Sequence, residues 1–113
     1  MSLDLTNKGT IVTSGAVQLV IDKTQNAHYD VTIYIHNLSG SDVLQIIVNL
    51  WDSVSGAFRL YKPGSIAPCL ATDLDKAKKF NWTFTTRFKI EIQQTAGTTG
   101  KSINYEVAIL PLP

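Results

Sequence analysis

Few residues of this chain have side chains typical of catalytic or metal-binding sites, and they lie far apart in the sequence. His28 and His36 flank Asp30, and imidazole with carboxylate serves both metal binding and acid–base catalysis. In an extended strand His28 and Asp30 point to the same side, but two donors fall short of the three or four that a metal site uses. We therefore expect neither a metal ion nor a cofactor.

Other patterns typical of active sites are missing. Cys69 is the single cysteine, and its neighbours Pro68 and Leu70 indicate a half-buried structural thiol rather than a nucleophile. Asp73 and Asp75 lack the further oxygen ligands that calcium needs, so they indicate a solvated acidic loop. The sequence contains no glycine-rich phosphate loop and no Gly-x-Ser-x-Gly turn. We expect a protein that is not an enzyme.

The composition argues against two classes of partner, nucleic acids and membranes. The chain has 113 residues, ten basic and nine acidic side chains, and a net charge of +1. This length fits one domain. The nearest approach to a basic cluster is Lys76, Lys78 and Lys79, which is typical of a solvated loop, so we expect no nucleic-acid partner. No apolar run approaches the roughly 20 residues that span a membrane, so we expect no membrane partner.

The dominant signal is alternation of apolar and polar residues with a period of two. In the segment 87–94, Phe88, Ile90 and Ile92 share one face, while charged and amide side chains share the other. Such a pattern predicts a strand with one buried and one solvated face. The same alternation occurs in the segments 17–21, 29–36 and 103–109.

Turn signals separate these segments and predict the fold class. Asp52 to Gly56 and the segment 96–100 are typical of hairpin connections, and Lys62-Pro63-Gly64 of a tight turn. We expect an all-β fold of about eight strands, an antiparallel two-sheet β-sandwich that is jelly-roll-like, with an immunoglobulin-like sandwich as the alternative. The expected organisation is an N-terminal arm at 1–8, a sandwich domain at 9–110 and a C-terminal tail at 111–113.

The segment Val43–Trp51 differs from the other predicted strands because both its faces carry apolar residues. Val43, Ile47 and Trp51 share the face that also holds Gln45 and Asn49. Such a strand is either covered on both sides within its own chain or presents an apolar stripe to a partner. We predict a partner interface formed by Tyr34, Val43, Ile47, Trp51, Leu110 and Leu112.

The aromatic residues allow two interpretations. Phe80, Trp82 and Phe84 alternate, so they form either an aromatic ladder in the core or a platform on which sugar rings stack. Tyr34 and Trp51 lie on the outer faces of their predicted strands. They are either aromatics at a subunit contact or residues covered by a loop of the same chain.

The C-terminal part resembles a known family. The segment 88–98 reads F-K-I-E-I-Q-Q-T-A-G-T and the segment 101–107 reads K-S-I-N-Y-E-V. These resemble the "K-V-T-L-Q-Q-T-A-G-T" and "K-x-F-x-W-E-V" segments of small, uncharacterised virion accessory proteins of tailed phages and related archaeal viruses. Tyr105 stands where that pattern often has Trp. Phe58–Tyr61 is similar to the family's "Y-R-x-Y", and Val43–Trp51 to its "D-T-V-x-I-R", without the Arg. The likeness extends over about residues 9–110.

The resemblance implies a structural virion protein, assembled in the host cytoplasm and located in the virion. We expect a homo-oligomer, with a trimer favoured, that decorates a capsid or serves as a head or tail accessory protein and contacts viral shell or tail proteins. The alternative is a carbohydrate-binding or adhesive module that uses exposed aromatics, with a glycan as its partner.

Overall fold

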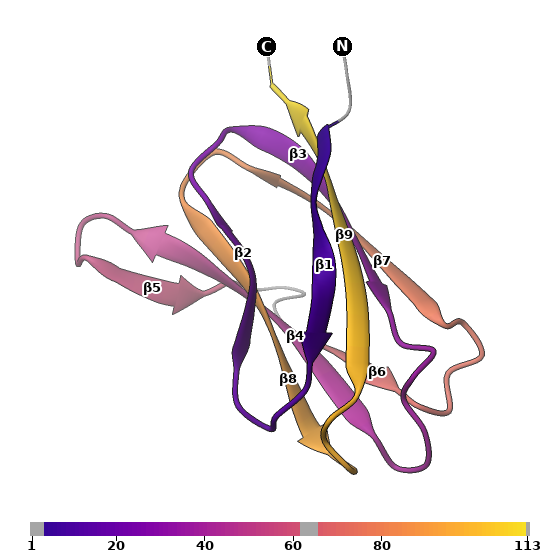
Figure 1. Ribbon diagram of the computed structural model, residues 1–113. Coiled ribbons are helices and arrows are strands. Elements are labelled where there is room, and N and C mark those ends of the chain that lie inside the picture. The colour runs from indigo at the N-terminus through magenta and orange to yellow at the C-terminus, as the bar shows by residue number, and fades with distance from the viewer. Residues whose placement is uncertain (1–3, 62–65, 113) are drawn as a thin grey trace.

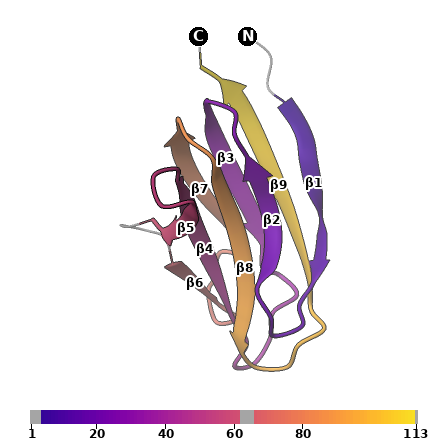
Figure 2. The same cartoon turned by 90° about the vertical axis from the view of Figure 1, so that its left-hand side faces the viewer.

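The computed structural model describes residues 4–61 and 66–112 and contains nine strands in two antiparallel sheets. Sheet A has the order β1 (Asp4–Val12), β9 (Ser102–Pro111), β3 (Ala27–Tyr34) and β7 (Ala77–Phe84). In sheet B, β2 (Gln18–Lys23) pairs with β8 (Phe88–Ala96), and β8 with β4 (Val43–Asp52). Both β5 (Ala57–Leu60) and β6 (Ile66–Leu70) pair with the far side of β4. The sheets form two facing layers (Figures 1 and 2).

This strand order is that of a jelly roll. Successive strands alternate between the sheets from β1 to β4 and again from β7 to β9, and β5 and β6 together fill one strand position beside β4. In an immunoglobulin-like sandwich the first two strands share a sheet, whereas β1 and β2 lie in different sheets. The predicted jelly-roll-like sandwich is therefore confirmed.

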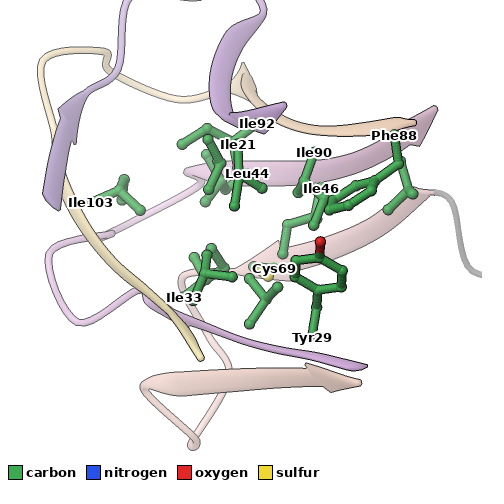
Figure 3. Packing of buried hydrophobic residues seen from close by; sticks show 14 of the residues in the cluster. Ile21, Tyr29, Ile33, Leu44, Ile46, Cys69, Phe88, Ile90, Ile92 and Ile103 are labelled. Carbon is green, nitrogen blue, oxygen red and sulfur yellow. The ribbon is translucent and has the colours of Figure 1, made fainter. Parts of the chain in front are cut away.

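The core fills the space between the sheets with the residues that alternation predicted. Phe88, Ile90 and Ile92 of β8 have no solvent exposure, and neither have Tyr29 or Ile33 of β3 (Figure 3). The Tyr29 ring lies edge-on to Phe88 at 4.6 Å between centroids, a favoured aromatic geometry. Its hydroxyl donates a hydrogen bond to the carbonyl of Gln25 at 2.6 Å, which satisfies the one polar atom of this buried side chain.

Three sequence-based assignments differ from the structure. Residues 4–8, expected in an N-terminal arm, belong to β1, because Asn7 pairs with Val107 and Lys8 with Glu106 in sheet A. Residues 1–3 lie outside the described part. Likewise Lys78 and Lys79, expected in a loop, belong to β7, where they pair with Ile33 and Thr32. In both cases long-range pairing orders a polar segment. Pro111, expected in the tail, ends β9 opposite Ala27.

A buried polar network closes the end of the sandwich at which three loops meet. Gln94 and Asp42 are 4% and 2% exposed. The Gln94 amide donates to Asp42 Oδ1 at 3.3 Å and to the carbonyls of Ala96 and Thr98 at 3.0 and 2.9 Å. The Thr13 hydroxyl donates to Gln94 Oε1. The network joins the β1–β2, β3–β4 and β8–β9 connections, so the Gln-Gln-Thr-Ala-Gly-Thr segment specifies the fold.

Residues 4–61 and 66–112 contain no helix with the length and apolar character that a membrane crossing requires.

Candidate functional site

The outer face of sheet B carries an apolar row on its central strand. Val43, Ile47 and Trp51 of β4 are half-buried, while their neighbours Leu44 and Ile46 point inward and are fully buried. No described residue of the chain covers the row completely. The strand is thus central in its sheet and still presents apolar side chains outward, and a partner that covers them stays a prediction.

Exposed leucines on three other strands share this outer face: Leu60 and Leu70 lie on strands next to β4, and Leu19 lies on β2, beyond β8. Each leucine lies directly opposite an outward-facing residue, so it shares the outer face. Leu19 pairs with Glu91, Leu60 with Asn49 and Leu70 with Val43. The three leucines are 53%, 41% and 41% exposed. Together with Val43, Ile47 and Trp51 they define what we call the sheet-B face.

An aromatic pair with two cations occupies one end of the sheet-B face. Trp51 and Phe58 pair across the β4–β5 hairpin, with ring centroids 5.0 Å apart in an edge-to-face arrangement. The Arg87 guanidinium carbon lies 5.1 Å from the Trp51 ring centroid and 5.0 Å from that of Phe58. Lys89 Nζ lies 4.4 Å from the Phe58 centroid. These are cation–π distances, so the cations engage the two rings.

Arg87 is held in place by Asp22 of β2. Its Nε and Nη2 donate to the two carboxylate oxygens at 3.1 and 2.9 Å, a two-point contact that fixes the plane of the guanidinium. Hydrogen bonding to Arg87 lowers the pKa of Asp22. On the same face Asn49 donates to Glu91 Oε1 at 3.1 Å. The polar groups around Trp51 are thus already ordered in the isolated chain.

The predicted interface residues do not form one surface. Tyr34 and Leu110 lie on the outer face of sheet A, opposite Asn104 and His28 respectively. Leu112, 41% exposed, follows β9. Only Val43, Ile47 and Trp51 lie together. The assignment of Tyr34 to the same region as β4 was wrong, because β3 and β4 belong to different sheets.

A shallow depression of about 370 Å³ lies on the outer face of sheet A beside Tyr34. The Tyr34 hydroxyl donates to Glu106 Oε1 at 3.2 Å, and this hydrogen bond raises the pKa of Tyr34. Hydrogen-bonding groups and two tyrosines meet here on three strands or their ends. The lining residues are Lys8, Gly9, Thr10, Tyr34, His36, Asn104, Tyr105 and Glu106.

His28 and Asp30, considered above for metal binding and acid–base catalysis, form a hydrogen-bonded row with Thr83 on sheet A. His28 Nε2 lies 3.1 Å from Asp30 Oδ1, and Nδ1 lies 3.0 Å from Thr83 Oγ1. Both ring nitrogens are engaged by neighbouring side chains. In the described part of the chain, no group of three or more His, Cys, Asp or Glu side chains is placed to hold a metal ion.

The remaining candidates have structural roles. Cys69 is buried, and burial raises the pKa of its thiol to about 11, far from that of a reactive thiolate. Asp73 accepts a hydrogen bond from the Leu70 backbone N–H at 3.1 Å and pairs with Lys78 at 3.1 Å. Its carboxylate thus stabilises the turn between Leu70 and Asp73.

The aromatic ladder of β7 lies on the core side of sheet A and packs against the core cluster. Phe84 is 4% exposed and stacks on Phe88 with centroids 4.1 Å apart, so it belongs to the core. Phe80 and Trp82 are half-buried and stack on each other with centroids 5.4 Å apart. They lie on β7, an edge strand of sheet A.

Sequence reasoning missed the Phe58–Arg87–Lys89 part of the sheet-B face. Phe58 comes from one segment and Arg87 and Lys89 from another, and only strand pairing brings them beside Trp51. The one available signal was the alternation in β8, which placed Arg87 and Lys89 on the solvated side of the sheet.

Comparison with known proteins gives no family. No family model matches the chain, and no curated protein matches it. Among solved structures, the chain is similar to the CBM22-1 xylan-binding domain from Paenibacillus barcinonensis Xyn10C, with 9% sequence identity and a TM-score of 0.47. The alignment covers 99% of this chain and 83% of that one. The jelly-roll assignment rests on the strand order of this chain itself.

Proposed function

We propose that this chain is a non-enzymatic assembly domain that docks on a protein partner through the sheet-B face. One observation carries the proposal, the half-exposed row of Val43, Ile47 and Trp51 on a central strand. Trp and Arg dominate the binding energy of many protein interfaces, and here Trp51 lies against Arg87 at 5.1 Å. Burying such a row contributes about 25 cal/mol per Å² of apolar area before the costs of association.

The chemistry of this face favours a protein partner over a sugar. A sugar ring stacks on an unoccupied aromatic face, whereas the Phe58 ring is approached by both Arg87 and Lys89 and the Trp51 ring by Arg87. Two ion pairs, Asp22 with Arg87 and Glu91 with Lys89, lie on one side of the apolar row of β4, and Glu91 is directly opposite Ile47. They offer a protein partner polar groups beside the apolar residues.

The resemblance of the segments 88–98 and 101–107 supports a virion as the place of assembly. On this proposal the partner is a viral shell or tail protein, and the chain decorates a capsid or serves as a head or tail accessory protein. Self-association into an oligomer is compatible with docking through the sheet-B face.

The test is co-sedimentation of the purified chain with virus particles of its own source that lack it. Ile47→Asp places a charge at the centre of the sheet-B face, and we expect it to lower particle binding at least tenfold. Thr32→Asp is the matched control, because Thr32 is half-buried on the outer face of sheet A between Lys79 and Glu106. Equal loss in both variants, or binding unaffected by Ile47→Asp, contradicts the proposal.

The depression beside Tyr34 favours a second candidate function, glycan binding. It combines two tyrosines with amide, hydroxyl, amine and carboxylate groups, the lining that sugar hydroxyls require. A glycan array with Tyr34→Ala and Trp51→Ala variants tests it. Binding that is lost in Tyr34→Ala and kept in Trp51→Ala supports this candidate, while the absence of any glycan signal removes it.

A further inference from the structure

The four edges of the two sheets differ in how well they could accept another strand. The β1 edge has an irregularity between Asp4 and Asn7, and the β2 edge has one between Leu19 and Ile21. The fourth edge is shared by β5, which has only four residues, and β6, which contains Pro68 and so lacks one N–H to donate. Bulges and prolines are devices that block edge-to-edge pairing. By contrast, β7 pairs with β3 over eight residues, Ala77 to Phe84, without a register shift.

The direction of the backbone groups on β7 follows from one hydrogen bond. The Ile35 N–H donates to the carbonyl of Lys76 at 2.7 Å, in continuation of the β3–β7 register. In an antiparallel pair the hydrogen-bonded residues alternate. The even-numbered residues of β7 therefore bond to β3, and the odd-numbered ones direct their N–H and C=O groups away from the sheet. These outward residues are Ala77, Lys79, Asn81 and Thr83.

We propose that β7 pairs with β7 of a second copy of this chain, antiparallel and centred on Asn81, to join two A sheets into one. In this register Phe80 lies opposite the partner's Trp82, so two half-exposed aromatic pairs cover each other. Cross-strand aromatic pairs of this kind stabilise the pairing of two strands.

The charges on β7 are compatible with the same register. Lys79 lies opposite the partner's Thr83 rather than opposite another lysine. Lys78 faces inward and is neutralised by Asp73 at 3.1 Å. A register centred on Lys79 would instead place two lysines against each other, which is destabilising. The contact is twofold, so it forms dimers and not the trimer favoured from the sequence. It uses a different surface from the sheet-B face.

The mass in solution tests the contact. Light scattering over a concentration series should show the 12.4 kDa chain approaching twice that mass as concentration rises. Asn81→Pro removes one outward N–H without removing a backbone hydrogen bond to β3, and we expect it to stay monomeric. Asn81→Ala keeps the N–H and should dimerise like the parent chain, as should Lys8→Pro at the β1 edge. A parent chain that is monomeric throughout, or a dimer or trimer that persists in Asn81→Pro, overturns the proposal.

Cross-linking tests the register and does not depend on the proline variant folding. Asn81→Cys places two cysteines opposite each other at about 5.5 Å between Cα atoms, within disulfide range. Thr83→Cys places them roughly 13 Å apart along the strands, beyond that range. We expect oxidised dimers from Asn81→Cys and not from Thr83→Cys, and the reverse result overturns the register. Ile47→Asp should leave the cross-link unchanged, which separates this contact from docking on a particle.

Discussion

Asp42 and Gly97 lie so close together that a side chain at position 97 would collide with the aspartate. A Cβ at Gly97 would lie 2.6 Å from the Asp42 Cα, and the Gly97 φ of +88° belongs to the left-handed region that glycine favours. The closeness lets the Thr98 N–H reach Asp42 Oδ1 at 2.9 Å. The β3–β4 and β8–β9 connections are thereby held together across 55 residues of sequence.

We predict that Gly97→Ala lowers the free energy of unfolding by about 3 kcal/mol or more, because it combines a strained φ with a steric clash. Gly56→Ala is the matched control. Gly56 also has a positive φ, +71°, but a Cβ there meets nothing within 4 Å, so we expect a loss of about 1 kcal/mol. Urea unfolding of both variants checks this, and equal losses would show that the Asp42 contact is not what constrains position 97.

Gln94→Leu should destabilise the chain by about 2–3 kcal/mol, because buried acceptors lose their donor. The affected groups are Asp42 Oδ1 and the carbonyls of Ala96 and Thr98. The neighbouring Gln93 is half-buried and makes one hydrogen bond, to the carbonyl of Gly15 at 3.1 Å. Gln93→Leu should therefore change stability by less than about 1 kcal/mol. Thermal melts of both variants distinguish them, and a larger effect at Gln93 would contradict the network.

The loss of folding stability at acidic pH should depend on Asp42. The backbone N–H of Ser39, that of Thr98 and the charge of Lys101 lower the pKa of Asp42 in the folded chain. The stabilisation is therefore present in full above the unfolded value of about 3.9 and is lost as pH falls through the lower folded value.

Unfolding measured near neutrality and at about pH 3 checks this against Asp42→Asn, in which the other carboxylates are retained. We expect the variant to be less stable near neutrality and to lose less stability on acidification than the parent chain. Parallel pH profiles would be inconsistent with a lowered Asp42 pKa.

The Cys69 thiol should not react with thiol reagents while the chain is folded. It is 1% exposed, and its pKa of about 11 keeps it protonated near neutrality. We expect one thiol per chain to react after denaturation and almost none before. Fast labelling of the native chain would mean that the β6 region opens readily. The labelling rate would then measure how often this region opens.

Local patterns were enough to predict the core but not the surfaces. Alternation placed Phe88, Ile90 and Ile92 inside, because the faces of a strand are fixed by a period of two. Which sheet each strand joins depends on pairing between distant segments. For that reason Tyr34 was grouped with Trp51 although they lie on opposite faces of the sandwich, and the contact of Arg87 with Trp51 was not predicted.

The start of β1 was missed for a related reason. The segment Asp4–Lys8 has no apolar alternation, and it is ordered as a strand by its partner β9. Likewise, no sequence pattern links Gln94 to Asp42. The Gln-Gln-Thr-Ala-Gly-Thr segment marked the turn, while the buried partner 52 residues earlier became visible only in the folded chain.

Hydroxyl-radical footprinting of the chain, free and bound to virus particles, tests the docking surface most directly. If the sheet-B face is the contact, Trp51 and Phe58 should be oxidised more slowly on the particle, and Tyr34 on the opposite sheet should be unchanged. Protection of Tyr34 with no change at Trp51 and Phe58 would contradict the account and move the contact to the depression on sheet A.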